Sequence, residues 1–150
     1  MAVYFSSEDI SFKFPGRTAV KQWIKFIIET EHYIAGNIGI IFCSDNYLLK
    51  VNMEYLQHDF FTDIITFDYS ENNIISGDLF ISADRVRENA KLFSTEPYNE
   101  LLRVIAHGIL HLARYEDNTP SNRKMMTGKE NMYLQAWEKL YRPVKNVKTT

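Results

Sequence analysis

The sequence has few of the features that mark secreted or membrane proteins. It contains one cysteine, Cys43, among 150 residues, so no disulfide can form within the chain, and a reducing compartment such as the cytosol fits. No run approaches the roughly 20 apolar residues of a membrane-spanning helix. The N-terminal segment also lacks the charged and then apolar layout of a signal peptide. These absences predict a soluble, cytoplasmic protein with no membrane partner.

A surplus of charge is missing as well. Lysine and arginine number 17 and the acidic residues 19, which leaves a formal net charge of −2 and no overall basic field of the kind that marks a nucleic-acid binder. The 4 prolines stand singly and no linker or internal repeat is present, so we expect one domain over residues 1–150. Because 45% of the residues are hydrophobic, the core needs no structural metal, and any metal ion is expected to be functional.

Hydrophobic periodicity predicts a small sheet packed with helices. Short β-rich runs predict strands, the last two of them close enough to pair in antiparallel fashion, at residues 3–6, 38–43, 64–69 and 78–82. Apolar residues at helical spacing predict helices at residues 17–31, 46–57, 84–93 and 97–113, and a last one after Thr119. The helix at residues 97–113 is apolar on more than one face, which predicts a central, buried position.

Two of these helices have a definite expected orientation. In the helix at residues 46–57, Asp45 is the candidate N-cap, and the apolar residues at helical spacing are Leu49, Met53 and Leu56. The last helix has Thr119 as its expected cap and Pro120 in its first turn. Its expected inner face is formed by Met126, Tyr133, Trp137 and Leu140.

The segment H-G-I-L-H-L-A-R-Y-E-D contains a candidate metal site. His107 and His111 are four residues apart on the buried helix, so both imidazoles lie over one patch of surface. Two such histidines alone are more often ordinary core residues. Zinc needs further ligands, and a chain that turns back after Ala113 brings Asp117 to the same point. Glu116 is the alternative third ligand, and a third reading has neither carboxylate at the metal.

Gly108 separates this segment from the metalloproteases. Extended metalloprotease zinc motifs share the histidine spacing, but they place a glutamate, the general base, directly after the first histidine. Without that base, peptide hydrolysis by this route is not expected. A glycine inside a helix costs about 1 kcal/mol relative to alanine, so we expect a strand or a substrate to approach closely at Gly108.

Three segments together resemble one known family. H-G-I-L-H-L-A-R-Y-E-D resembles the H-G-x-L-H-L-x-G-Y-D-H signature of the YbeY-type ribosomal RNA maturation endoribonucleases. Upstream, N-M-E-Y-L-Q-H-D-F-F-T-D-I-I-T-F resembles that family's N-x-x-Y-R-x-x-D-x-x-T-D-V-L-S-F, and S-G-D-L-F-I-S resembles its G-D-I strand. The resemblance covers about residues 45–120. It implies an α/β (α+β) fold with a small mixed four-stranded sheet, about five helices, and a zincin-like metal cleft on the central helix.

The chain departs from the family pattern at three positions. Asp117 stands where the family usually has a third histidine, and a carboxylate ligand makes water on the ion less acidic. Arg114 replaces a glycine, and a left-handed backbone there costs arginine roughly 1–2 kcal/mol unless the loop takes another path. Leu56 replaces an arginine and cannot grip phosphate. Another cation would have to do so, and the candidates are Arg85, Arg87, Arg103 and Arg114.

The remaining polar positions allow two readings each. Thr62, Asp63 and Asp78 fit ordinary turn and strand-end roles. In the functional reading, Asp63 or Asp78 accepts a proton from the attacking water or orients a metal-bound histidine. The row Arg17, Lys21 and Lys25 on the first helix reads as a solvated face, and its alternative is a track for the RNA backbone.

The resemblance implies a zinc-dependent, single-strand-specific endoribonuclease in ribosomal RNA maturation and small-subunit assembly. One zinc ion would be held by His107, His111 and Asp117, with Asp63 and Asp78 as catalytic candidates. The implied partners are precursor ribosomal RNA, the small subunit, and a ribosomal protein or ribosome-assembly GTPase. The alternative is a non-catalytic, metal-containing assembly factor that binds RNA or a ribosomal protein, which Gly108 and Leu56 favour. Hydrolysis of a smaller substrate is a third reading.

Overall fold

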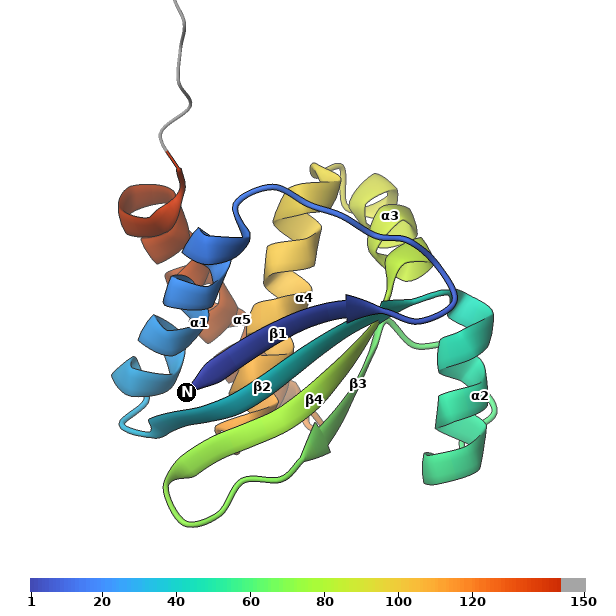
Figure 1. Ribbon diagram of the computed structural model, residues 1–150, viewed down its shortest axis with the longest axis horizontal. Coiled ribbons are helices and arrows are strands. Elements are labelled where there is room, and N and C mark those ends of the chain that lie inside the picture. The colour runs from blue at the N-terminus through green and yellow to red at the C-terminus, as the bar shows by residue number, and fades with distance from the viewer. Residues whose placement is uncertain (144–150) are drawn as a thin grey trace, which may run out of the picture.

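Four strands form one mixed sheet in the order β1-β2-β4-β3, as seen in the computed structural model, which describes residues 1–143 (Figure 1). The strands are β1 (Ala2–Ser7), β2 (Ile34–Cys43), β3 (Ile64–Asp68) and β4 (Ile74–Ser82). β1 runs parallel to β2 and β2 parallel to β4, whereas β3 pairs with β4 in the predicted antiparallel sense. β2 and β4 each begin four residues earlier than predicted, because Ile34 and Ile74 already pair with each other.

The helices divide between the two faces of this sheet. Ile75, Leu79 and Ile81 of β4 pack into the main core. The helices of this core, on one side of the sheet in Figure 1, are α1 (Arg17–Thr30), α3 (Ala83–Leu92), α4 (Pro97–Leu112) and α5 (Pro120–Ala136). The alternate residues of the same strands face the other way, since successive side chains point to opposite faces. There α2 (Asp45–Leu56) covers Ile65, Phe67 and Phe80 in a smaller cluster.

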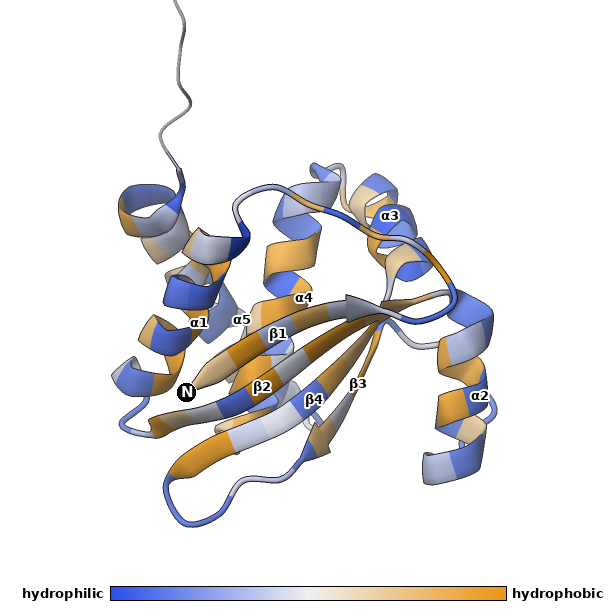
Figure 2. Cartoon of the chain, viewed as in Figure 1, coloured by the Kyte–Doolittle hydropathy of each residue, from blue (hydrophilic) through white to orange (hydrophobic). Residues whose placement is uncertain are grey.

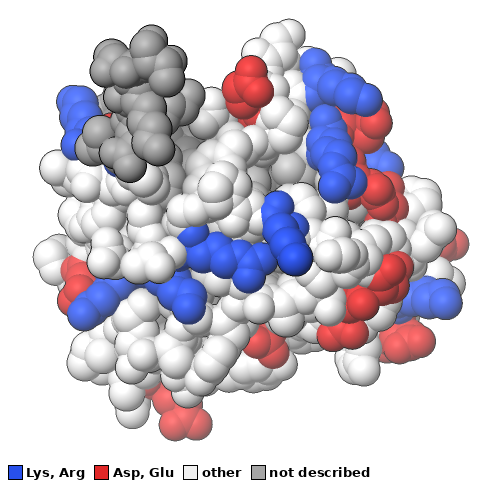
Figure 3. All heavy atoms as spheres, turned by 45° about the horizontal axis from the view of Figure 1, so that its top comes forward, with Lys and Arg blue, Asp and Glu red and all other residues white. Residues whose placement is uncertain are grey.

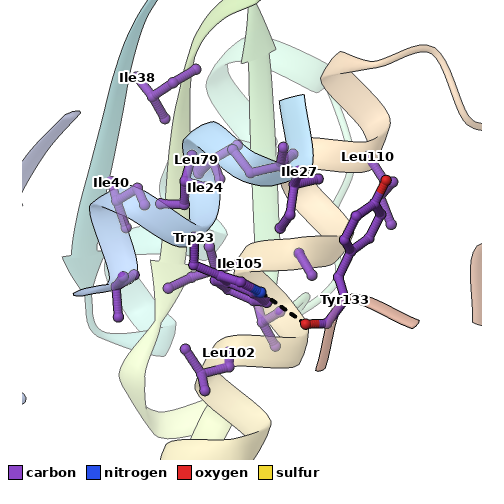
Figure 4. Packing of buried hydrophobic residues seen from close by; sticks show 14 of the residues in the cluster. Trp23, Ile24, Ile27, Ile38, Ile40, Leu79, Leu102, Ile105, Leu110 and Tyr133 are labelled. Carbon is purple, nitrogen blue, oxygen red and sulfur yellow. Dashed lines mark hydrogen bonds between the residues drawn. The ribbon is translucent and has the colours of Figure 1, made fainter. Parts of the chain in front are cut away.

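The main core surrounds α4. Ten residues of this helix are buried, which confirms its predicted central position. Figure 2 shows that the strands and α4 carry long apolar stretches. Trp23 of α1 is fully buried, and its indole Nε1–H donates to the carbonyl oxygen of Tyr133 at 2.8 Å, which ties α1 to α5 (Figure 4). Within residues 1–143, none of the helices is long and apolar enough to cross a membrane.

The predicted four-stranded sheet and five main helices are therefore present, but the predicted face of α2 is wrong. Its N-cap is Ser44, whose hydroxyl oxygen accepts the Tyr47 N–H at 3.1 Å, whereas Asp45 is already inside the helix. The buried side chains are Leu48, Val51 and Asn52. The sequence contains two overlapping apolar rows, and contact with the sheet selects the row of Leu48 and Val51. As a result, Met53 is 48% and Leu56 43% exposed.

The last helix follows its prediction over most of its length. Thr119 caps it by accepting the Asn122 N–H at 3.0 Å, and Met126, Tyr133 and Trp137 are buried as expected. Leu140 is 70% exposed, so its predicted inward position is wrong. The helix changes to a π-helical turn over Trp137–Tyr141, and the wider turn rotates Leu140 away from the core. The single domain was predicted to residue 150, and residues 144–150 lie outside the described part of the chain.

Gly108 explains how the sheet comes close to α4. A Cβ atom at this position would lie 2.7 Å from Cδ1 of Ile64 and 2.9 Å from Cδ1 of Leu79, which is closer than side chains can approach. The predicted close approach is thus that of β3 and β4. The missing side chain lets these strands pack directly on the helix turn that contains His107.

Candidate metal centre

Three candidate ligand atoms converge at the C-terminal end of α4. The Nε2 atoms of His107 and His111 lie 2.9 Å apart. Oδ2 of Asp117 lies 3.2 Å from Nε2 of His107 and 3.4 Å from Nε2 of His111. Two ligands that each lie about 2.0–2.1 Å from a tetrahedral zinc ion are about 3.3 Å from one another. The spacing of the three groups therefore fits a zinc ion.

A helix-terminating turn carries Asp117 back to the histidines. The Arg114 N–H donates to the His111 carbonyl at 2.9 Å, and the Tyr115 N–H donates to the Leu110 carbonyl at 3.0 Å, which together form a Schellman motif. Arg114 has a φ of 75°, so it keeps the left-handed backbone that glycine would adopt without strain. Its guanidinium donates to the carbonyl of Asn72 at 2.9 Å. The chain thus forms the left-handed turn at Arg114 that was expected for a glycine, and the loop does not take another path.

The outer nitrogen of each imidazole has a fixed partner. Nδ1 of His107 lies 2.7 Å from a carboxylate oxygen of Glu130 on α5, and the other oxygen of Glu130 accepts from Arg103 at 2.9 Å. Nδ1 of His111 donates to the carbonyl oxygen of Tyr115 at 2.9 Å. A hydrogen bond at Nδ1 fixes the ring and leaves Nε2 free to bind a metal. Both Nε2 atoms are therefore oriented toward Asp117.

The environment of His107 favours its protonated form. Burial lowers the pKa of His107, but the hydrogen bond and negative charge of Glu130 outweigh burial and hold the pKa above its ordinary value. A carboxylate partner of this kind also makes the imidazole a stronger metal ligand. Protons and metal ions then compete for the same Nε2 atom.

A hollow of about 430 Å³ opens beside these ligands, and Asp63 lines it. Burial disfavours the charged carboxylate and raises the pKa of Asp63, although His107 nearby opposes the change. The backbone carbonyl of Asp63 accepts the Ser82 N–H at 2.9 Å, which fixes the start of β3 next to the hollow. Thr62 also lines the hollow, but its hydroxyl donates to the Ile64 carbonyl at 3.3 Å, in keeping with a structural role.

Asp78 does not reach this hollow. It lies one residue before Leu79, which packs on Gly108, and so its side chain points to the opposite face of β4. Its neighbours across the sheet are Gly39 and Phe67. The structure therefore separates Asp78 from the metal centre and leaves Asp63 as the catalytic candidate. Neither aspartate orients a histidine, which was the second option of the functional reading, because the Nδ1 partners are Glu130 and the Tyr115 carbonyl.

Between the two alternative carboxylates, Glu116 and Asp117, the geometry favours Asp117. Asp117 belongs to the group of converging ligand atoms, whereas the neighbouring Glu116 is exposed and does not line the hollow. The turn at Arg114 fixes the direction in which the chain leaves α4, and this direction places Asp117 and not Glu116 beside the histidines.

Four arginines were candidates to bind phosphate in place of the arginine that Leu56 replaces, and none of them lines the hollow. Arg85 pairs with Asp45 at 2.6 Å, and Arg103 is bound to Glu130. Arg87 lies over the Phe12 ring at 5.7 Å, and the Arg114 guanidinium binds the Asn72 carbonyl. Among residues 1–143, the hollow is lined by no lysine or arginine. Leu56 itself lines it.

The basic row of α1 lies apart from the metal centre. Arg17 and Lys21 lie over the ring of Phe5 at 5.6 and 5.8 Å, while Lys25 is exposed. Figure 3 shows lysine and arginine side chains in a band across the middle of the face in view, and others beside carboxylates toward its right. The reading of the row as a solvated face stays a prediction.

Sequence reasoning missed Glu130, the residue that orients His107. The sequence did contain an indication of its role, since Glu130 is a charged residue within the apolar row of Met126 and Tyr133. The structure places it on the inner face of α5, where it is only 6% exposed. It also missed Glu31, which accepts the Tyr115 hydroxyl at 2.5 Å and Lys129 at 3.2 Å. Glu31 thereby helps to fix the residue whose carbonyl holds His111.

Comparison with known proteins identifies the family of this chain. The family model described as Endoribonuclease YbeY matches residues 3–138. Endoribonuclease YbeY of Parabacteroides distasonis is 52% identical over 134 residues, which cover 89% of this chain and 94% of that protein. The protein of the same name from Cytophaga hutchinsonii is 44% identical, with coverage of 88% and 93%. A solution structure of a Thermotoga maritima protein shares the fold with a TM-score of 0.62 at 26% identity, and the match covers 91% of this chain and 89% of that one.

The matched region contains all three converging ligand residues, the strands β3 and β4, and the Glu130 carboxylate that orients His107. On this evidence, the chain belongs to the endoribonuclease YbeY family.

Proposed function

We propose that the chain is a zinc-dependent endoribonuclease that cleaves single-stranded RNA during ribosomal RNA maturation and small-subunit assembly. The observation that carries the proposal is the convergence of His107, His111 and Asp117 beside an open hollow. It is supported by relatives that are named endoribonucleases over most of the chain's length.

The donor set suits a catalytic zinc ion. Two imidazole nitrogens and one carboxylate oxygen are ligands that zinc accepts, and three protein ligands leave a further position open to water or substrate. We therefore assign one zinc ion per chain to this site. When bound, such an ion supplies Lewis acidity, which makes water a nucleophile near neutral pH and stabilises negative charge that develops on phosphate.

The residues around the ligands have separate roles in this proposal. Asp63 accepts the proton of the attacking water, because a buried carboxylate with a raised pKa is a better base near neutral pH than an exposed one. Glu130 and the Tyr115 carbonyl hold the two imidazoles in place through their Nδ1 atoms. Asp78 has no part in the reaction, since it lies on the other face of the sheet.

We infer the biological setting from the family resemblance. The substrate is precursor ribosomal RNA on the small subunit, with a ribosomal protein or a ribosome-assembly GTPase as a further partner. The compartment is the cytoplasm, where bacterial ribosomes are assembled.

The proposal is tested by single-turnover cleavage of one RNA sequence, presented as a single strand and as a duplex. Zinc-loaded protein should cleave the single strand only, chelated protein should not cleave, and added zinc should restore activity. Asp63→Asn should lower the rate roughly 100-fold or more. The matched control is Asp68→Asn, since Asp68 is an exposed carboxylate that lines the same hollow and should be dispensable.

The alternative function is a non-catalytic assembly factor. It is favoured by Leu56 and by the absence of a lysine or arginine from the hollow among the described residues. RNA binding without cleavage by zinc-loaded protein, on single-stranded and structured ribosomal RNA alike, would support this alternative and exclude the enzyme.

A further inference from the structure

The hollow beside the metal centre has an aromatic part that the metal chemistry does not use. Besides the candidate ligands, its lining includes Leu56, His58 and Phe60. Phe60 is 56% exposed, although a phenylalanine gains by burial. An exposed apolar surface next to a reactive centre is the usual mark of a place where a ligand binds.

The two rings form an ordered pair. The imidazole of His58 and the ring of Phe60 have centroids 5.1 Å apart and planes inclined by only 20°, so they are stacked. Because both residues line the hollow, the stacked pair contributes aromatic surface to it. A nucleobase can stack on such a surface whatever its sequence, because every base has a π-face of its own.

A buried side chain holds this pair in position. Asn52 of α2 is 1% exposed, and its amide Nδ2 donates to the Phe60 carbonyl at 2.9 Å. The backbone carbonyl of Asn52 accepts the His58 N–H at 3.1 Å. Gln57 between them takes the left-handed conformation, with a φ of 56°. The loop is thus anchored at both ring-bearing residues, which reduces the entropy lost when a ligand stacks there.

The charge of the hollow argues against a phosphate grip at this point. Its lining contains the carboxylates of Asp63, Asp68 and Asp117, and no lysine or arginine from residues 1–143. A phosphate would be repelled by these groups except where a metal ion neutralises them. An uncharged base meets no such repulsion. The part of the RNA that best matches Leu56, His58 and Phe60 is therefore a base and not its phosphate.

We propose that His58 and Phe60 form a stacking platform for one unpaired nucleobase of the RNA, beside the phosphate that lies at the metal centre. This inference rests on the proposed function. The platform takes over part of the binding that an arginine at position 56 would supply, with Leu56 as its apolar edge. It requires a base that has left its helix, since stacked and paired bases expose no face, and it therefore selects single-stranded RNA.

The test measures coupling between Phe60 and a base. Binding is measured in a zinc-loaded Asp63→Asn background, in which cleavage by the proposed route is slowed roughly 100-fold or more while the ion still neutralises the carboxylates. This protein is titrated with a fluorescent single-stranded RNA of ten nucleotides and with versions that carry one abasic site at each position in turn. Phe60→Ala should weaken binding of the intact strand roughly 5- to 100-fold. At one position, removing the base should weaken binding to the protein that has Phe60 by the same factor as Phe60→Ala does. The same abasic strand should bind the Phe60→Ala variant as well as the intact strand does.

The control is Phe61→Ala. Phe61 is similarly exposed, at 49%, but the Arg85 guanidinium lies over its ring at 5.5 Å and it does not line the hollow, so its removal should leave RNA affinity unchanged. Phe60→Tyr keeps the ring and should bind like the parent, which separates loss of stacking from loss of folding. The platform is disproved if Phe60→Ala binds like Phe61→Ala, or if the losses add independently at every abasic position.

The outcome also separates this inference from the proposed function. If zinc-loaded parent cleaves RNA while no abasic position couples to Phe60, the endoribonuclease proposal stands and only the platform fails. If the parent neither binds nor cleaves RNA, both fail together.

Discussion

Glu130 of α5 receives the Nδ1–H of His107 on α4 at 2.7 Å. This hydrogen bond connects the last long helix of the chain to the metal centre, and the second oxygen of the same carboxylate binds Arg103 at 2.9 Å. Because Glu130 is 6% exposed, water does not readily replace it. The final helix thus has a direct role in the site as well as in the core.

The first prediction concerns metal affinity. Glu130→Ala should weaken zinc binding roughly 10- to 100-fold, because His107 loses the partner that orients its ring and increases its basicity. Glu130→Gln should lose less, since an amide oxygen can still accept the Nδ1–H. Affinity is measured by competition with a chromogenic chelator. Glu138→Ala is the control, because Glu138 is exposed and pairs with Arg142 away from the site. Parent-like affinity of Glu130→Ala would show that the contact does not support the metal.

The second prediction uses two glycines in helices. Gly108→Ala should destabilise the protein by up to about 2 kcal/mol. The new Cβ would lie 2.7 Å from Cδ1 of Ile64 and 2.9 Å from Cδ1 of Leu79, and overpacking costs about 1–3 kcal/mol, of which the gain in helix propensity offsets about 1 kcal/mol. Gly128→Ala should instead stabilise it by about 0.5–1 kcal/mol, since nothing lies within 4 Å and alanine favours the helix. Urea denaturation of the two variants gives the comparison. Equal signs for the two changes would contradict the close approach of the strands at Gly108.

The third prediction isolates the backbone strain at Arg114. Arg114→Gly and Arg114→Ala both lose the guanidinium contact with the Asn72 carbonyl, so they differ mainly in the left-handed residue, whose φ is 75°. The glycine variant should have a free energy of unfolding about 1 kcal/mol greater than the alanine variant. Chemical denaturation of both proteins without metal is the measurement. An alanine variant as stable as the glycine variant would argue against strain in this turn.

The fourth prediction concerns acid stability. Burial raises the pKa of Glu31, but hydrogen bonds from Tyr115, Tyr133 and Lys129 outweigh it and hold the pKa below its ordinary value of 4.5. A carboxyl whose pKa is lowered by folding contributes stability above its unfolded pKa, and this stability is lost as the pH falls through the folded value. Stability of the parent should therefore decline below about pH 4.5.

The matching variant is Glu31→Gln. It should be less stable than the parent at pH 7, because the tyrosine and lysine donors lose a charged acceptor. The difference should shrink as the pH falls from 5 to 3. Urea midpoints across this range test the idea, and a difference that stays constant with pH would show that Glu31 does not titrate as described.

The ligands of the metal centre were visible in the sequence because they are local. His107 and His111 are one helix turn apart, and Asp117 follows after a single turn of the chain, so spacing indicated a candidate site there and left Glu116 as the alternative third ligand. Glu130 could not be found in this way, since it lies 23 residues from His107 on another helix. The sequence also could not show that Asp78 lies away from the metal centre. Strand alternation places it opposite Leu79, but only the packing of Leu79 on Gly108 shows which face meets the metal centre.

In the fold, too, local features could be predicted from the sequence, whereas contacts between distant residues could not. The strands, the antiparallel pair and the helices follow from local periodicity, and all of them are present. The inner face of α2 was misjudged because its two apolar rows differ only in their contact with Phe67 and Phe80, which are distant in sequence. Leu140 was misjudged because a π-helical turn changes the spacing that the pattern assumes.

The central claim is that the RNA is cleaved at a zinc ion held by His107, His111 and Asp117. The most direct measurement is zinc content and single-strand cleavage, determined together for the parent, Asp117→Ala and Glu116→Ala. We predict one zinc per chain and cleavage for the parent and for Glu116→Ala, and loss of both for Asp117→Ala. Cleavage by the parent that persists after complete zinc removal, or zinc that is kept by Asp117→Ala and lost by Glu116→Ala, would contradict the account.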